Sequence, residues 1–181
     1  MEDASILKKF AVPETREEAF TLLLKKYQQK LYWHIRRLVI DHDDADDIVQ
    51  DVFIKIWKNL DKFREDAQLY TWLYRIATNE CITFLNKKKQ RNQVSLEDEN
   101  SAYLADTLKD SSHFNGNRAQ QKLQEAILTL PDKQRLVFNM KYFEDLKYDE
   151  MSTILGTSVG ALKASYHLAV KKIEQYFHDT D

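Results

Sequence analysis

Trp72, Arg75 and Asn79 are spaced so that an aromatic ring, a guanidinium and an amide share one stripe of a helix. At about 100° per residue, positions i, i+3 and i+7 fall within roughly 60° of one another. Aromatic rings stack on unpaired bases, and guanidinium and amide groups bond phosphates and base edges. The stripe therefore suits single-stranded nucleic acid. Core packing of these aromatic side chains, with Tyr70 and Tyr74 nearby, explains the pattern equally well.

The segment 43–91 that carries this stripe is predicted to form two amphipathic helices joined by a charged loop, residues 61–66. The first helix repeats apolar residues at three/four spacing: Ile48, Val49, Val52, Phe53, Ile56, Trp57 and Leu60. Aspartates at 43, 44, 46 and 47 suit its positive N-terminal end. The second helix is expected to bury Leu69, Leu73, Ile76, Ala77 and Leu85, and it ends in the basic cluster Lys87, Lys88, Lys89 and Arg91.

A further helix is predicted before this pair, from about residue 16 to residue 40. Thr15 and Glu18 have the spacing of a capping box at its start. The helix would pack on the central pair, so residues 1–92 are predicted to form one helical domain.

The charge pattern changes sharply after that domain. Residues 71–92 carry five basic side chains against one acid, whereas residues 93–117 carry five acids against one lysine. Residues 93–117 are therefore predicted to be a flexible acidic linker. Helical periodicity returns over residues 118–181, where Gly156 is placed to end one short helix in a left-handed turn and Ser158 to begin the next. A helix, a three-residue turn containing Gly and a second helix form the helix-turn-helix signature.

Composition predicts an all-α protein of two small domains. The chain has 181 residues with 43% hydrophobic and 31% charged side chains, but only three Gly and two Pro. A net charge of −2 argues against a protein that coats nucleic acid. The single cysteine and the absence of a long apolar run favour a cytoplasmic protein. No catalytic or metal-ligating constellation appears, so no enzyme activity, cofactor or metal is predicted.

Two stretches resemble a known family. DADDIVQDVFIKIW followed by FREDAQLYTWLYRIATN is similar to region 2 of the extracytoplasmic-function (ECF) sigma factors of bacterial RNA polymerase. SVGALKASYHLAVKKIE resembles region 4 of the same family. The resemblance covers about residues 15–178 and is weakest across residues 93–117.

The resemblance implies three sets of site residues. Core RNA polymerase would bind Asp47, Gln50, Asp51 and Lys55. The minus-ten element would be held as single strand by Lys55, Asn59, Phe63, Trp72, Arg75 and Asn79. The minus-thirty-five duplex would meet Lys141, Lys163, Ala164, Ser165, His167 and Leu168. Ala164 and Leu168 donate no side-chain hydrogen bond, so base readout there would depend on Lys163, Ser165, His167 and methyl contacts.

The partners implied are core RNA polymerase, promoter DNA and an anti-sigma factor, often membrane-bound in this family, with no small-molecule substrate. A conventional helix-turn-helix regulator of duplex DNA is the alternative function. That class usually carries a sensor or receiver domain, and residues 1–117 show no strand–helix alternation that would indicate one. A helical adaptor that binds no DNA would leave the stripe and the basic cluster unexplained.

Overall fold

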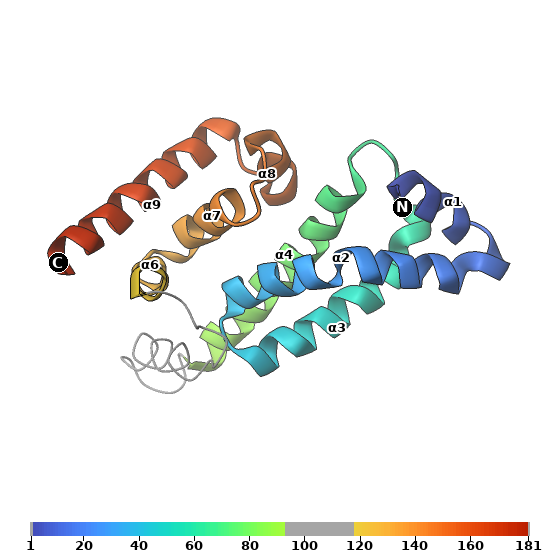
Figure 1. The fold of residues 1–181 in the computed structure, drawn as a ribbon, viewed down its shortest axis with the longest axis horizontal. Helices are drawn as coiled ribbons and strands as arrows, with labels where there is room; N and C mark the ends of the chain where they lie inside the picture. Colours follow the sequence, from blue (N-terminus) through green and yellow to red (C-terminus); the bar gives the residue numbers. More distant parts are fainter. Residues whose placement is uncertain (1, 93–117, 181) are drawn as a thin grey trace. The chain divides into compact units, whose positions relative to one another are not determined.

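The computed structural model describes residues 2–92 and 118–180, in which every regular element is a helix (Figure 1). The predicted all-α class is confirmed for these ranges. The chain divides into two compact units, residues 1–86 and 87–181, and each is described by itself. The predicted linker, residues 93–117, lies outside the described residues.

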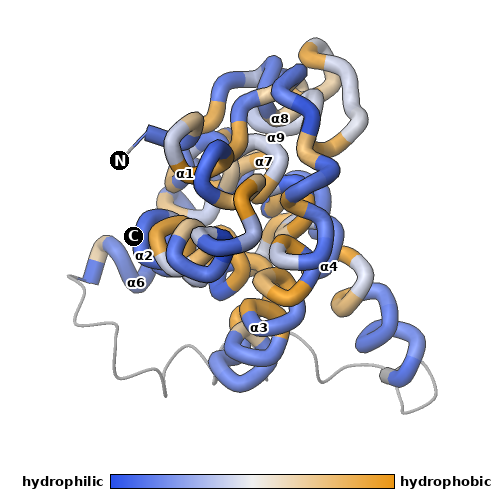
Figure 2. Tube along the Cα trace, turned by 90° about the vertical axis from the view of Figure 1, so that its right-hand side faces the viewer, coloured by the Kyte–Doolittle hydropathy of each residue, from blue (hydrophilic) through white to orange (hydrophobic). Residues whose placement is uncertain are grey.

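The first unit is built on three long helices with a short helix at their start (Figure 1). Its elements are α1 (Asp3–Phe10), η1 (Pro13–Thr15), α2 (Arg16–Val39), α3 (His42–Asn59), η2 (Leu60–Lys62) and α4 (Leu69–Asn92). The helix predicted over residues 16–40 is confirmed as α2. The last turns of α4 are hydrophilic (Figure 2), because they contain the basic cluster Lys87, Lys88, Lys89 and Arg91.

Helix α1 was not predicted from the sequence, and it changes the role of Thr15. The Thr15 hydroxyl donates to the Lys9 carbonyl oxygen at 2.7 Å, whereas Glu18 pairs with the Lys9 ammonium at 2.7 Å. Thr15 makes no side-chain cap to α2, so the predicted capping box is wrong. The ring of Phe10 packs edge-on against Trp57 with centroids 5.5 Å apart. Both residues of the expected box therefore help to fasten α1.

A sharp turn without glycine joins α2 to α3. Ile40 has a φ of 69° although it is β-branched, and the Asp41 amide donates to the Val39 carbonyl oxygen at 2.8 Å. The side chain of Asp41 then accepts a hydrogen bond from the Asp44 amide at 3.0 Å. Asp41 is thus the N-cap of α3, just ahead of the aspartates expected there. Ile40 is buried, and its packing offsets the strained backbone.

His34 is buried where α2 meets α4. Its Nε2 lies 2.8 Å from the Thr78 hydroxyl, and its ring centroid lies 4.9 Å from that of Tyr74. Burial, assisted by the nearby Arg37 charge, lowers the pKa of His34 to about 3. The imidazole is therefore neutral near pH 7 and acts as a core residue.

Within residues 118–180, the second unit contains four helices: α6 (Arg118–Leu128), α7 (Asp132–Tyr142), α8 (Tyr148–Leu155) and α9 (Val159–Thr180). Apolar side chains of α6, α7 and α9 form its core, among them Ile127, Phe138 and Ile173. The ring of Phe138 stacks on both Tyr142 and Tyr166, with centroids 5.1 and 5.8 Å apart. The contact with Tyr166 packs α9 against α7.

The buried His34 predicts that the first unit loses stability in mild acid. In the unfolded chain His34 has a pKa near 6.5, whereas in the folded chain its pKa is about 3. The unfolded state therefore binds a proton that the folded state does not, and the free energy of unfolding falls as the pH drops below 6.5. The expected loss between pH 7 and pH 5 is about 2 kcal/mol. His34→Gln keeps a polar partner for Thr78 without a titrating group, so its loss should be smaller.

Urea unfolding followed by tryptophan fluorescence measures this unit alone, because Trp33, Trp57 and Trp72 all lie within it. An equal pH dependence in the wild type and in His34→Gln would show that another group is responsible.

Candidate nucleic-acid interface

The outer face of α3 carries the residues that the family resemblance implies for polymerase binding. Asp47, Gln50, Asp51 and Lys55 are all exposed. Ile54 lies on the same face and is 50% exposed, which is unusual for so large an apolar side chain. Ile54 was not predicted from the sequence as part of this surface. Its position outside the apolar repeat of α3 was the signal that could have found it.

Lys55 and Asn59 both make contacts within the first unit. The Lys55 ammonium pairs with Glu80, so it links α3 to the outer part of α4. The Asn59 amide donates to the Lys55 carbonyl oxygen at 2.9 Å, and the Lys62 ammonium lies 3.4 Å from its amide oxygen. The ion pair with Glu80 places Lys55 beside the part of α4 that carries Asn79, and Asn59 lies one turn further along α3.

The stripe itself is part aromatic pair and part open surface. The ring of Phe63, from the loop before α4, packs on Trp72 with centroids 5.4 Å apart and an angle of 54°. Both rings are half-buried, whereas Arg75 and Asn79 are exposed. Among the described residues, the side chains of Arg75 and Asn79 have no hydrogen-bond or ion-pair partner. Both interpretations of the stripe therefore hold in part. The rings of Phe63 and Trp72 pack the loop before α4 onto the helix, whereas Arg75 and Asn79 are exposed and available to bind a ligand.

The inner face of α4 differs in part from the prediction. Leu69, Leu73 and Ala77 are buried as expected, but Ile76 and Leu85 are only half-buried. Tyr74, Thr78 and Cys81 are buried instead, because His34 draws Tyr74 and Thr78 toward α2. A histidine partner for a buried threonine cannot be read from apolar periodicity.

The helix-turn-helix expected in the second unit is present as α8, residues 156–158 and α9. Gly156 has a φ of 64° and its amide donates to the Ser152 carbonyl oxygen at 2.9 Å. The Ser158 hydroxyl oxygen accepts a hydrogen bond from the Ala161 amide at 3.2 Å and caps α9. Both predictions for this turn are confirmed.

The first turns of α9 present the residues assigned to the minus-thirty-five element. Lys163, Ala164, His167 and Leu168 are exposed, with Leu168 at 48%, and Ser165 is half-buried. Lys141, at the end of α7, is half-buried, and its ammonium donates to the Leu146 carbonyl oxygen at 3.2 Å. This hydrogen bond attaches Lys141 to the loop that leads into α8, the first helix of the helix-turn-helix.

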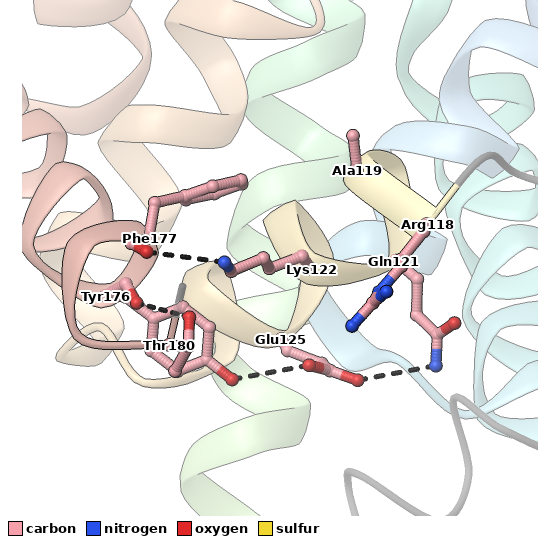
Figure 3. A pocket seen from close by; sticks show the side chains of 8 residues that line it. All are labelled: Arg118, Ala119, Gln121, Lys122, Glu125, Tyr176, Phe177 and Thr180. Atoms are coloured by element: carbon pink, nitrogen blue, oxygen red, sulfur yellow. Dashed lines mark hydrogen bonds between the residues drawn. The ribbon is translucent and has the colours of Figure 1, made fainter.

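A pocket at the other end of the second unit, between α6 and α9, is no comparable site (Figure 3). Tyr176 donates to Glu125 at 3.3 Å, and Lys122 donates to the Phe177 carbonyl oxygen at 3.3 Å. The polar groups there fasten the two helices to each other. Elsewhere in the described ranges, no group of three acidic, histidine or cysteine side chains could hold a metal ion. No helix within those ranges is long and apolar enough to span a membrane.

Comparison with known proteins gives a family for both units. The family model of sigma-70 region 2 matches residues 23–91, and that of sigma-70 region 4 matches residues 120–173. The ECF RNA polymerase sigma factor SigW of Bacillus subtilis is 31% identical over 170 residues, which cover 90% of this chain and 91% of that protein. The chain belongs to the ECF family of RNA polymerase sigma factors.

Two further similarities agree. The ECF RNA polymerase sigma-E factor of Escherichia coli K12 is 31% identical over 166 residues, covering 87% of this sigma factor and 86% of the relative. The fold is similar to that of the sigma factor RpoE from Bartonella quintana, solved in complex with the anti-sigma factor NepR. That similarity has a TM-score of 0.73 and 24% identity, and it covers 88% of this chain and 96% of the other.

The two glycines of the helix-turn-helix provide a matched test of the turn in this sigma factor. Gly156→Ala places a Cβ at a left-handed residue and should destabilise the second unit by about 1–2 kcal/mol. Gly160 lies in the first turn of α9 with open space around it, so Gly160→Ala should be neutral or stabilise by up to about 0.5 kcal/mol. Hydrogen exchange of the α8 and α9 amides measures both. Equal effects of the two substitutions would contradict the role given to Gly156.

Proposed function

We propose that the two units of this sigma factor divide promoter recognition between them. The first would bind core RNA polymerase and hold the minus-ten element as single strand, and the second would bind the minus-thirty-five element as duplex. The single observation that carries this proposal is the pair of exposed polar groups, Arg75 and Asn79, beside the packed rings of Phe63 and Trp72. Such a surface fits splayed bases better than a regular double helix.

The polymerase-binding surface of the proposal is the outer face of α3. Asp47 and Asp51 supply negative charge, Gln50 supplies hydrogen bonds, and Ile54 supplies apolar area that gains by being covered. An apolar side chain ringed by polar groups is the usual composition of a protein–protein contact. Lys55 would belong to the edge of this surface, since it already pairs with Glu80.

Minus-ten recognition would use the side of α4 that faces away from His34. Arg75 would bond backbone phosphate or a base edge, and Asn79 can both donate to and accept from a flipped base. Phe63 and Trp72 would offer a ring surface at the edge of the same site, and Asn59 and Lys55 would border it. Base capture of this kind offsets the cost of unstacking the opened strand.

Minus-thirty-five recognition would use the start of α9 in a major groove, as helix-turn-helix proteins do. His167 and Ser165 can bond base edges, and Ala164 and Leu168 can contact thymine methyl groups. Lys163 and Lys141 supply positive charge at the same end of the unit.

The remaining assignments follow from membership of the family. The chain would act in the cytoplasm as an initiation factor without catalysis of its own. An anti-sigma factor is a further proposed partner, since the similar RpoE of Bartonella quintana was solved with NepR. A conventional helix-turn-helix regulator gains no support, because the sigma-70 match extends over residues 23–91 as well.

Run-off transcription with purified core RNA polymerase tests the proposal. Wild-type chain should direct transcripts from a subset of fragments in a genomic promoter library, and loss of the chain should abolish them. Asp47→Arg with Asp51→Arg should reduce co-purification with core polymerase by about ten-fold or more, because two attractive charges become repulsive.

The matched control is Glu14→Arg with Glu17→Arg, which changes the net charge equally at exposed positions near the start of α2. Unchanged co-purification of the α3 variant, or an equal loss in the control, would remove the polymerase-binding assignment.

A further inference from the structure

One ring in the helix-turn-helix contacts two lysines from different helices. The Lys141 ammonium lies 5.2 Å from the centroid of the Tyr148 ring, and the Lys163 ammonium lies 5.7 Å from the same centroid. Both distances fall within the range of cation–π attraction. Tyr148 therefore joins the end of α7 to the beginning of α9, although it belongs to α8.

The position of Tyr148 is fixed by its own helix start. The Lys147 amide donates to the Glu150 carboxylate at 2.8 Å, which closes the first turn of α8 around Tyr148. The loop before it is held by the bond from the Lys141 ammonium to the Leu146 carbonyl oxygen, at 3.2 Å. Tyr148 is half-buried, so its ring has a fixed place while part of it remains accessible.

The two ammonium groups near this ring have no counter-charge of their own. In the part of the chain that the structure describes, neither Lys141 nor Lys163 lies within ion-pair distance of a carboxylate. Long lysine side chains lose rotamer freedom when they bind a ligand, and prior contact with a ring reduces that loss. Two pre-placed like charges without a counter-charge form a site for an anion.

We propose that Tyr148 is a positioning residue that holds Lys141 and Lys163 against one stretch of the promoter DNA backbone. This inference rests on the proposed function and adds what these two lysines recognise: phosphate oxygens, not base edges. A lysine ammonium is a point charge without the planar fork that reads a base edge in two hydrogen bonds, so a fixed pair of them suits phosphate. Base readout on α9 is then left to Ser165, His167 and their apolar neighbours.

Equilibrium binding of reconstituted holoenzyme to a promoter fragment recovered by run-off transcription tests this assignment between 50 and 200 mM salt. Lys141→Ala and Lys163→Ala should each lower the slope of log affinity against log salt by about 0.9, without relaxing preference at any base pair. Tyr148→Leu keeps both charges, so it should weaken binding by about two- to five-fold at an unchanged slope. Tyr148→Phe keeps the ring and should bind as the wild type does.

Combining Tyr148→Leu with the two lysine substitutions separates a positioning role of Tyr148 from a general structural role. In a Lys141→Ala, Lys163→Ala background, Tyr148→Leu should cause no further loss, because the groups that it positions are gone. An equal loss in that background, or a changed base preference in Lys163→Ala, would overturn the inference. Failure of the wild-type chain to form holoenzyme would overturn the proposed function itself.

The free chain offers an independent measurement if Tyr148→Leu does not fold. The methylene protons beside the ammonium groups of Lys141 and Lys163 should show upfield NMR shifts from the ring current of Tyr148. Tyr148→Phe should preserve those shifts. Ordinary lysine shifts at both positions in the wild type would overturn the positioning role.

Discussion

The contact between α2 and α4 at His34 is the constraint on which the proposed minus-ten site depends. A hydrogen bond to Thr78 and ring contact with Tyr74 fix which side of α4 is buried. Asn79 follows Thr78 by one residue, and Arg75 follows Tyr74, so both are turned about 100° away and reach solvent. A buried polar contact thus decides which side chains of α4 can meet DNA.

The two proposed DNA sites have different surfaces because different local structures hold their residues in place. In the first unit, Phe63 and Trp72 brace a loop of irregular backbone against a helix, which leaves a surface with rings and amides for separated bases. In the second unit, Gly156 and Ser158 set a tight turn, which presents one regular helix to a groove. The Tyr148 ring contacts two lysines beside that helix, and in the proposed complex these lysines would meet the phosphates of the duplex.

Much of this architecture could be predicted from the sequence, because periodicity and turn chemistry are local. The span of α2, the acidic start of α3, the left-handed Gly156 and the Ser158 cap were all predicted correctly. The capping box at Thr15 failed because α1, which was not predicted, takes up both of its residues. His34 and Tyr148 acquire their roles only from residues on other helices, which periodicity does not reveal. Residue spacing identified Arg75 and Asn79, but it could not show that Trp72 would be occupied with Phe63.

The most direct test of the account is promoter opening by Asn79→Ala, compared with Asn86→Ala, an exposed asparagine two turns further along α4. Permanganate footprinting measures opening on duplex promoters, and run-off transcription measures use of templates premelted at the minus-ten element. The account predicts that Asn79→Ala loses opening and remains defective on premelted templates, because capture of the flipped base is itself impaired, whereas Asn86→Ala behaves as wild type. Normal opening and normal premelted-template use by Asn79→Ala would contradict the account and leave the stripe on α4 as packing.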